Sequence, residues 1–307
     1  MRLAHWMRQE NSGLAHTTLE IVEEEERQGH EVSLREPSTG AVLYGFDGKP
    51  DIHLVHNQLH PSAYHDGLPK VMWMHGEPLG SVGNGISMRA IVDLAPIMDA
   101  FICMRAEEQP IWHAIRRTYR VPKGIDLTRF MPQTPAPPKL SGSPAVLYYE
   151  NWRGQRNPLY LCHAMLKVRE VLPEAKLHLY NCPGGKMAET FQGLIDHCRW
   201  STFIGSLKRQ EPDVVTLLNR ADVVVSCLDP LYARGIEAFG CGKPYIGPGY
   251  HEADYPYQCR LDPTSMADAI IRAWSERDTF DARDWAKRHH DVSETVRLSV
   301  DVYKRFV

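Results

Sequence analysis

The chain has 307 residues, of which 43% are apolar and 24% are charged, and its formal net charge is −3. This composition is typical of a globular protein and excludes a chain that is mainly disordered. No apolar run approaches the roughly 20 residues that a membrane helix needs, and the amino terminus lacks the apolar core of a signal peptide. The sequence therefore predicts no membrane span and a cytoplasmic location.

The cysteines and the charge distribution argue against two kinds of partner, metal ions and nucleic acids. The seven cysteines are scattered, with no Cys-x-x-Cys pair and no histidine at zinc-finger spacing, which predicts reduced thiols and no metal site. Residues 1–135 carry 13 Lys and Arg against 17 Asp and Glu, a net charge of −4, and residues 136–307 carry 22 against 21, a net charge of +1. Neither part has the basic excess of a dedicated nucleic-acid binder.

The first 135 residues alternate between strand and helix patterns. Residues 2–6 (RLAHW) predict a strand. Residues 14–30 predict a helix that buries Leu19, Ile21 and Val22, turns residues 23–26 (EEEE) toward water and ends at Gly29. Further buried strands are predicted at residues 31–37, 51–57, 70–76 and 100–104. Because strands separated by helices pair in parallel, this half predicts a doubly wound sheet.

A second series of strands and helices follows a proline-rich stretch at residues 131–144, which predicts a linker. The predicted strands are residues 145–151, 175–181, 201–205, 222–228 and 243–247, and the predicted helices are residues 158–173, 187–198, 212–221 and 235–242. The sequence thus predicts an α/β protein with two Rossmann-like domains, 1–135 and 136–285, followed by a helix in 286–307. Open sheets of this kind bind ligands at the carboxyl ends of their strands, so a cleft between the domains is the expected site.

Two acids stand directly after a predicted buried strand, in the stretch CLDPLYARGIEAFGCGKPYIG (residues 227–247). Asp229 lies in the loop and Glu237 eight positions later. Their carboxylates could both face the cleft and accept hydrogen bonds from sugar or ribose hydroxyls. The alternative is a solvated loop acid and an acid at a helix start, where the helix dipole favours it.

The stretch EAFGCGKP (residues 237–244) resembles a motif of the family-4 type of GT-B glycosyltransferases, Glu-Ala-x-Ala-Cys-Gly-x-Pro, which follows a Glu-x7-Glu pair. Three further stretches resemble family landmarks in the same order: GLAHTTLEIVEEEERQGHEV, DIHLVHN and VPKGIDLTRFMP. The resemblance covers nearly the whole chain. It implies a retaining hexosyl- or pentosyltransferase that takes a UDP-, GDP- or ADP-sugar as co-substrate and needs no cofactor or metal, and in which the last helix returns to the first domain.

The resemblance also implies roles for residues that bind the donor. Glu237 would hold the ribose, Asp229 the hydroxyls of the transferred sugar, and Arg156, with Arg153, the diphosphate. Asp229 replaces the usual Glu, and Arg156 stands where the family has Lys. Negative charge grows on the diphosphate oxygen as the sugar leaves, and arginine offers a planar fork of donors for it. From the local sequence alone, both arginines could equally lie in a solvated loop.

A second group of residues is expected in the first domain. His75 ends the predicted strand at residues 70–76, and the resemblance implies that it lies against the transferred sugar. Ser12 and Gly13 are predicted to line the donor side of the same cleft, and Glu77, His56 and Asn57 the acceptor side. Most histidines are instead satisfied polar residues, and this chain has 15.

The class of acceptor is left open between a glycan, a small molecule and a hydroxymethylated base of viral DNA. Residues 115–120 (IRRTYR) form the densest basic cluster of the first half and are interpreted as a solvated helix face that could touch an anionic acceptor. The acidic first half favours a neutral acceptor. Two other functions fit the sequence: a nucleotide-sugar epimerase of the same architecture, and a sugar-binding relative without activity.

Overall fold

The computed structural model describes residues 1–7, 13–56, 58–75, 88–148, 159–180, 198, 201–205, 213–227, 233–248 and 254–307. The chain forms two compact units, the first from Met1–Asp126 with His289–Val307 and the second from Leu127–Arg288. The proline-rich stretch belongs to the second unit, because Leu140 donates its N–H to the Arg220 carbonyl and Lys139 pairs with Asp222. The chain therefore crosses from the first unit to the second near residue 126, whereas the sequence predicted the end of the first domain at residue 135.

The first unit is built on a seven-stranded sheet within the described residues, in the order β3-β2-β1-β4-β5-β6-β7. All neighbours pair in parallel except β2 and β3. The strands are β1 (Arg2–Trp6), β2 (Glu31–Arg35), β3 (Val42–Gly45), β4 (Ile52–Val55), β5 (Lys70–Met74), β6 (Ala100–Cys103) and β7 (Thr118–Arg120). The helices are α1 (Gly13–Arg27), α2 (Met88–Leu94), α3 (Gln109–His113) and α10 (Val292–Tyr303), with short 3-10 turns η1 (Pro61–Ala63) and η2 (Ala95–Ile97).

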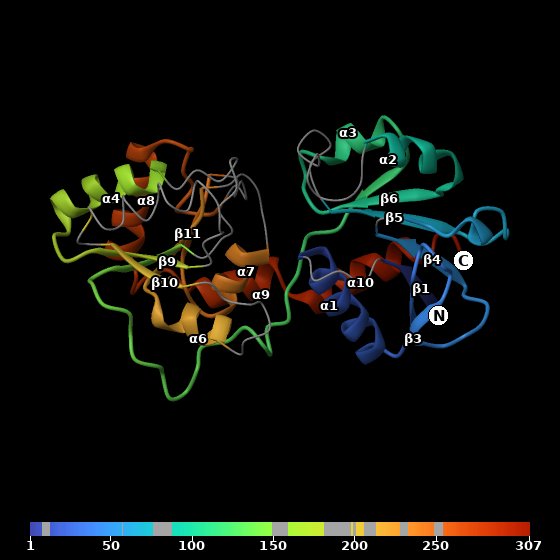
Figure 1. The fold of residues 1–307 in the computed structure, drawn as a ribbon, viewed down its shortest axis with the longest axis horizontal. Coiled ribbons are helices and arrows are strands. Elements are labelled where there is room, and N and C mark those ends of the chain that lie inside the picture. Colours follow the sequence, from blue (N-terminus) through green and yellow to red (C-terminus); the bar gives the residue numbers. More distant parts are fainter. Residues whose placement is uncertain are drawn as a thin grey trace. The chain divides into compact units, whose positions relative to one another are not determined.

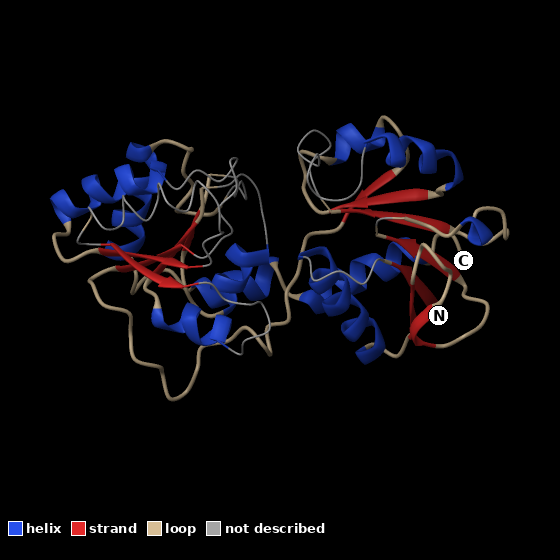
Figure 2. Cartoon of the chain, viewed as in Figure 1, coloured by secondary structure: helices blue, strands red, loops and turns tan. Residues whose placement is uncertain are grey.

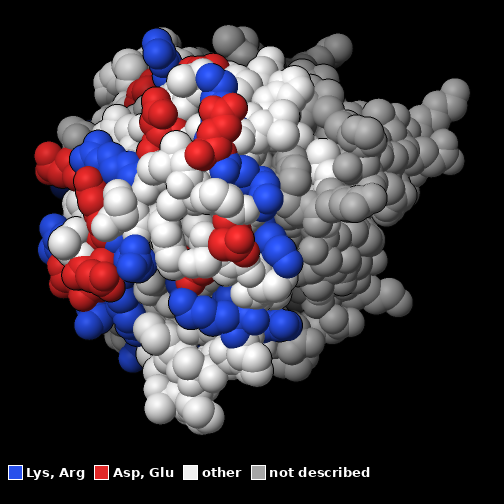
Figure 3. Space-filling view, turned by 90° about the vertical axis from the view of Figure 1, so that its left-hand side faces the viewer, with Lys and Arg blue, Asp and Glu red and all other residues white. Residues whose placement is uncertain are grey.

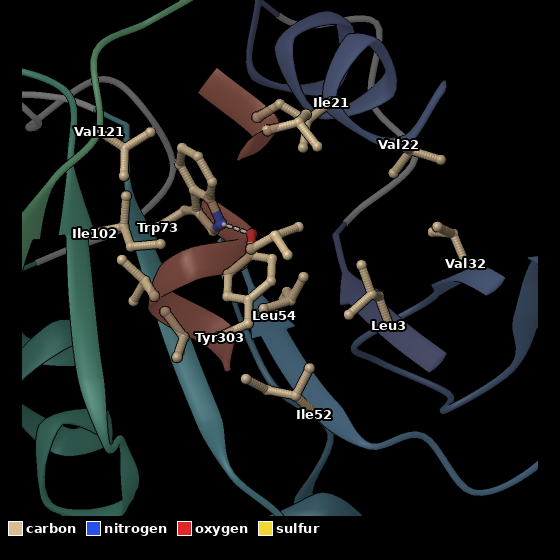
Figure 4. Packing of buried hydrophobic residues seen from close by; sticks show 14 of the residues in the cluster. Leu3, Ile21, Val22, Val32, Ile52, Leu54, Trp73, Ile102, Val121 and Tyr303 are labelled. Atoms are coloured by element: carbon tan, nitrogen blue, oxygen red, sulfur yellow. Dashed lines mark hydrogen bonds between the residues drawn. The ribbon is translucent and has the colours of Figure 1, made fainter. Parts of the chain in front are cut away.

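Helices cover both faces of this sheet (Figures 1 and 2). Alternate residues of β5 separate the two faces. Val71 and Trp73 pack in a cluster with side chains of α1 and α10, whereas Met72 and Met74 pack in a second cluster with side chains of α2 and α3. The Trp73 indole also donates a hydrogen bond of 3.1 Å to the Tyr303 hydroxyl, which ties β5 to the last helix (Figure 4).

The final helix belongs to the first unit although it follows the second in sequence. Thr295 donates its hydroxyl to the Pro122 carbonyl, at 2.9 Å, and the buried His290 donates from Nδ1 to the Lys123 carbonyl, at 3.0 Å. Gly124 permits this close approach, because a Cβ there would lie 2.5 Å from the Val292 Cα. This arrangement matches the expected return of the carboxyl-terminal helix.

The second unit contains a five-stranded parallel sheet among the described residues, in the order β10-β9-β8-β11-β12. Its strands are β8 (Ala145–Tyr148), β9 (Lys176–Tyr180), β10 (Ser201–Gly205), β11 (Val223–Val225) and β12 (Tyr245–Ile246). Its helices are α4 (Leu159–Val171), α6 (Asp213–Arg220), α7 (Ala233–Gly240), α8 (Pro263–Ser275) and α9 (Ala282–His289). Figure 1 shows α4 and α8 on one face of the sheet and α6 on the other. The α/β fold with two Rossmann-like units is thus confirmed.

Two parts of the sequence interpretation are wrong. Residues 115–120 are not a helix face, because α3 ends at His113 and β7 begins at Thr118. On α1, Glu24 and Glu25 do not face water: their exposed fractions are 6% and 0%, while Leu19 is 37% exposed. Glu24 accepts a hydrogen bond from Gln28 and pairs with Arg27 near the end of the same helix, whereas the Glu25 carboxylate turns toward β1 and contacts His5. Gly29 does end the α1 region, with a φ of +84°.

Candidate active site

Three histidines lie at the point of the first sheet where the strand order reverses. The chain runs from β1 outward to β2 on one side, and β4 pairs with β1 on the other side. Open α/β sheets bind ligands outside the carboxyl ends of the strands at such a point. His5 lies near the end of β1, His56 directly follows β4, and His75 directly follows β5.

Strand alternation brings the three rings onto one face. Leu3 and Leu54 point into the cluster beside α1 and α10 (Figure 4), so His5 and His56, each two residues further on, face the same way. Trp73 relates to His75 in the same manner. Parallel register sets the strands side by side: His5 pairs with Leu54, and Leu54 with Val71.

The rings form a continuous chain of short contacts that begins on α1. The Glu25 carboxylate Oε2 lies 2.6 Å from His5 Nε2, and His5 Nδ1 lies 2.8 Å from His56 Nε2. His56 Nδ1 lies 2.7 Å from His75 Nε2 and 3.2 Å from the Thr18 hydroxyl. The exposed fraction of Glu25, His5 and His56 is zero, and His75 is partly exposed. His75 is therefore the surface end of a buried chain.

The electrostatics keep the outer histidines neutral. Burial lowers the pKa of His56 well below its usual value, and the neighbouring His75 and His5 lower it further. Burial lowers the pKa of His75 to about 3, and the positive charge of Lys123 contributes. Lys123 is held beside α1 by a 2.9 Å hydrogen bond from its ammonium to the Thr17 hydroxyl. Neutral imidazole at His75 presents one N–H and one lone pair, so it suits hydrogen bonding to a hydroxyl or proton transfer from it.

The second unit has a matching point in its own sheet, between β8 and β11. Residues 149–158, with Arg153 and Arg156, follow β8, and residues 228–232, with Asp229, follow β11. Glu237 lies in the middle of α7, half-buried, and the first turn of that helix holds no acid. The alternative that Glu237 is an acid at a helix start is therefore excluded.

The structure brings together some of the predicted site residues. It describes His56 and His75, which are in contact, and it places Gly13 at the start of α1 and Glu237 on α7. The remaining predicted residues lie outside the described part of the chain: Ser12, Asn57, Glu77, Arg153, Arg156 and Asp229.

No protein-family model matches the sequence, and no curated protein matches it at a significant level. Solved structures do match it. A glycosyltransferase from Rickettsia africae has a TM-score of 0.70 at 13% identity, covering 99% of this chain and 98% of that one. HepE of Anabaena in complex with UDP and glucose has a TM-score of 0.68 at 12% identity, covering 99% of both chains. The chain has the GT-B fold.

A third GT-B structure similar to this chain contains nucleic acid. It is an alpha-glucosyltransferase in complex with UDP and a 13-mer DNA with a central A:G mismatch, and it has a TM-score of 0.68 at 12% identity, covering 99% of both chains. In the part of this chain that the structure describes, no group of three or more His, Cys, Asp or Glu side chains is arranged to hold a metal ion. No described helix is long and apolar enough to cross a membrane.

Sequence reasoning missed three members of the histidine chain: His5, Thr18 and Glu25. A signal for His5 was present, because a histidine stands at a buried position of the strand RLAHW. A buried histidine needs a polar partner. Glu25 gave no such signal, since it stands in a run of four glutamates that reads as a solvated face.

Buried neutral histidines should make the GT-B chain lose stability in mild acid. Burial lowers the pKa of His290 from 6.5 to about 4, so the unfolded state takes up a proton in this range while the folded state does not. The free energy of unfolding should then fall as pH decreases from 6.5 to 4, by about 1.4 kcal/mol per pH unit for one such group. Urea unfolding of the wild type and of His290→Gln at pH 7.5 and 5 tests this. The variant should show the smaller decrease, and an equal decrease in both proteins would contradict the assignment.

Proposed function

We propose that this protein is a retaining glycosyltransferase that moves a sugar from a UDP-sugar to a hydroxyl acceptor. The observation that carries the proposal is the likeness over 99% of the chain to GT-B structures with UDP bound. It is supported by the histidines at the reversal point of the first sheet, and by the predicted donor segments that follow β8 and β11 in the second. UDP is preferred to GDP or ADP because these neighbours hold UDP.

The proposed roles in donor binding follow the resemblance seen in the sequence. Glu237 would accept hydrogen bonds from the ribose hydroxyls, Asp229 from the transferred sugar, and Arg156 and Arg153 would neutralise the diphosphate. Ser12 and Gly13 are proposed to line the donor side of the site, and Gly13 begins α1. The half-buried position of Glu237 within α7 supports its role, because a partly desolvated carboxylate forms stronger hydrogen bonds than an exposed one.

A neutral hydroxyl is the proposed acceptor, bound beside His75 with Glu77, His56 and Asn57 nearby. The GT-B neighbour with bound DNA favours a second candidate, a hydroxymethylated DNA base. Two observations weigh against DNA: residues 1–135 have a net charge of −4, and on the face of the second unit around α4 and α8 Lys and Arg alternate with Asp and Glu (Figure 3). A polyanion binds best to a continuous basic surface.

The donor prediction is tested by thermal shift with UDP-, GDP- and ADP-glucose. A ligand present at 100 times its Kd stabilises the folded state by about 2.7 kcal/mol, and we expect this from the UDP-sugar. Glu237→Gln keeps the shape but removes the charge, so its affinity for UDP-glucose, measured by calorimetry, should fall by roughly ten- to a hundredfold.

The matched control is Glu276→Gln, a half-buried carboxylate paired with Arg272 on α8, which should bind as the wild type does. Failure of all three nucleotide sugars to bind would refute the function. Unchanged affinity in Glu237→Gln would refute the role of that residue alone. Product formed without any acceptor would favour the epimerase, and binding without turnover over a broad acceptor panel would favour the inactive sugar-binding protein.

A further inference from the structure

A cavity opens on the face of the first sheet that lies opposite α1 and α10. Side chains of β1, β2 and β4 alternate between the two faces, and Trp6, Arg35 and His53 line the cavity on this one. Its volume is about 260 Å³. Residues 36–51 join β2 to β4 through β3 and turns without a helix, so turns of this connection and the 3-10 turn η1 close this part of the face. The histidine chain of the candidate active site lies on the other face.

One wall of the cavity is a closed network of hydrogen bonds. The Trp6 indole N–H donates to Nδ1 of His53, at 2.9 Å, so the proton of this imidazole is on Nε2, which donates to the Asp66 carboxylate at 2.6 Å. Burial lowers the pKa of His53, which keeps the ring neutral. The Lys70 ammonium lies 2.9 Å from the other Asp66 oxygen. The negative charge of Asp66 is thus met by Lys70, and this wall presents no unpaired charge to a ligand.

Arg35 lines the same cavity with part of its guanidinium unpartnered. Nε donates to the Ser33 hydroxyl, at 3.3 Å, and Nη2 donates to the Gly48 carbonyl, at 2.5 Å, whereas Nη1 has no acceptor among the described residues. Burial lowers the pKa of Arg35, although Asp47 and Asp66 act in the opposite direction, and neither carboxylate forms an ion pair with it. A partly buried cation without a counter-ion is stabilised by an anion that binds beside it.

Lys49 adds a second unpaired cation to the cavity. It lies in the turn before β4, it is exposed, and its ammonium forms no ion pair within the part of the chain that the structure describes. Arginine offers a planar fork of donors, and lysine a compact point charge. Pro50, Ala63 and Leu68 also line the cavity. The cavity therefore combines two positive charges with a small apolar surface.

We propose that this cavity binds a phosphate group, either free or carried by a small molecule. A phosphate monoester has a charge of about −1.5 to −2 at neutral pH and three acceptor oxygens, which match two cations, whereas a carboxylate has a single charge. Nη1 of Arg35 donates to the phosphate oxygens, and Lys49 balances the second charge. Pockets for drug-sized ligands have volumes of roughly 300–1,000 Å³, so a molecule that carries the phosphate into this cavity is small. The site goes beyond the proposed sugar transfer and does not depend on it.

The test follows the Trp6 indole N–H by NMR, because the Arg35 guanidinium lies 5.7 Å from the centre of the Trp6 ring. Loss of one indole signal in Trp6→Phe identifies it. At constant ionic strength, inorganic phosphate and glycerol 3-phosphate should each shift this signal to saturation, and acetate should not. Equal affinity for the two phosphates would assign the site to the phosphate group alone, and tighter binding of the ester would assign it to a phosphorylated molecule. No saturable shift with either phosphate, or the same shift with acetate, would overturn the proposal.

Two variants locate the binding. Arg35→Gln removes charge-assisted hydrogen bonds worth about 1.5 to 3 kcal/mol, so the affinity for inorganic phosphate should fall by roughly ten- to a hundredfold. Lys49→Gln should lower it by up to about fivefold, because an exposed charge contributes less. Since Lys49 is exposed and unpaired, its replacement leaves the fold intact and gives a result even if Arg35→Gln is poorly folded.

The matched control in the same unit is Arg305→Gln, where the exposed guanidinium lies 5.0 Å from the centre of the Tyr119 ring, outside the cavity. It should bind phosphate as the wild type does. Arg156→Ala should also leave the phosphate shift of Trp6 unchanged, which separates this cavity from the proposed donor site. Unchanged affinity in both Arg35→Gln and Lys49→Gln, or an equal loss in either control, would overturn the proposal.

Discussion

Replacing His75 by Gln should lower turnover by roughly 10²- to 10³-fold, the effect of removing one positioned polar group beside the reacting centre. Glutamine is close to histidine in size and can keep a hydrogen bond to His56, but it removes the imidazole ring that is proposed to lie against the transferred sugar. Binding of UDP-glucose should change little, because the predicted donor residues Glu237, Arg153 and Arg156 belong to the second unit. The measurement is kcat and donor Kd for the wild type and the variant.

The matched control for this substitution is His65→Gln. His65 belongs to the same unit but is exposed and contacts the Tyr64 ring rather than the histidine chain. Its turnover should equal that of the wild type. Turnover of His75→Gln within threefold of the wild type would remove His75 from the reaction.

The sheets were predictable from the sequence because most of their strands are fully buried and follow turns. Residues 70–74 (KVMWM) illustrate this, since a short apolar run bounded by Pro69 and Gly76 has few alternatives to a parallel strand. The strands that escaped prediction are β3 and β7. β3 is mostly exposed at the edge of the sheet, and β7 has three residues, so neither carries a pattern long enough to read.

The sequence predicted only those site residues whose own position in the chain marks them as candidates. His56 and His75 end strands, and that position alone marks them as candidates under the rule for open sheets. Their connection to His5 and Glu25 depends on strand register and on the rotation of α1, which are tertiary properties. A helix with four consecutive glutamates must turn some of them toward the protein, because successive residues are about 100° apart around the axis. The sequence does not say which, and the partners on the sheet decide it.

Burial alone does not distinguish a histidine of the candidate site from other buried histidines. His53 and His178 are as well buried as His56, and burial lowers the pKa of each. His53 nevertheless pairs with Asp66, and His178 Nε2 with the Ser141 carbonyl, so neither histidine contacts another histidine through these bonds. What separates His56 is that both its nitrogens contact other histidines in a line that reaches the end of the strands.

Replacing Arg156 by Ala should lower turnover by roughly 10²- to 10³-fold, the effect of removing one donor that stabilises developing charge. The bond from the sugar to the diphosphate breaks in the transition state, so the leaving oxygen gains charge that the ground state lacks. The loss should therefore appear in kcat more than in donor Kd. Arg156→Lys should recover most of the activity, because the resembling family has Lys at this position and a point charge still meets the phosphate.

The control for Arg156 is Arg260→Ala in the same unit, where the side chain is 90% exposed and its nearest acid, Asp262, is 3.7 Å away. Surface pairs of this kind contribute little, so turnover should not change. If Arg156→Ala turned over as fast as Arg260→Ala, the diphosphate would have to be met by Arg153 or by backbone N–H groups. Arg153→Ala then decides between these two: a loss on the scale expected for Arg156 would assign the role to Arg153, and wild-type turnover would leave the N–H groups at the start of α7 as the remaining donors.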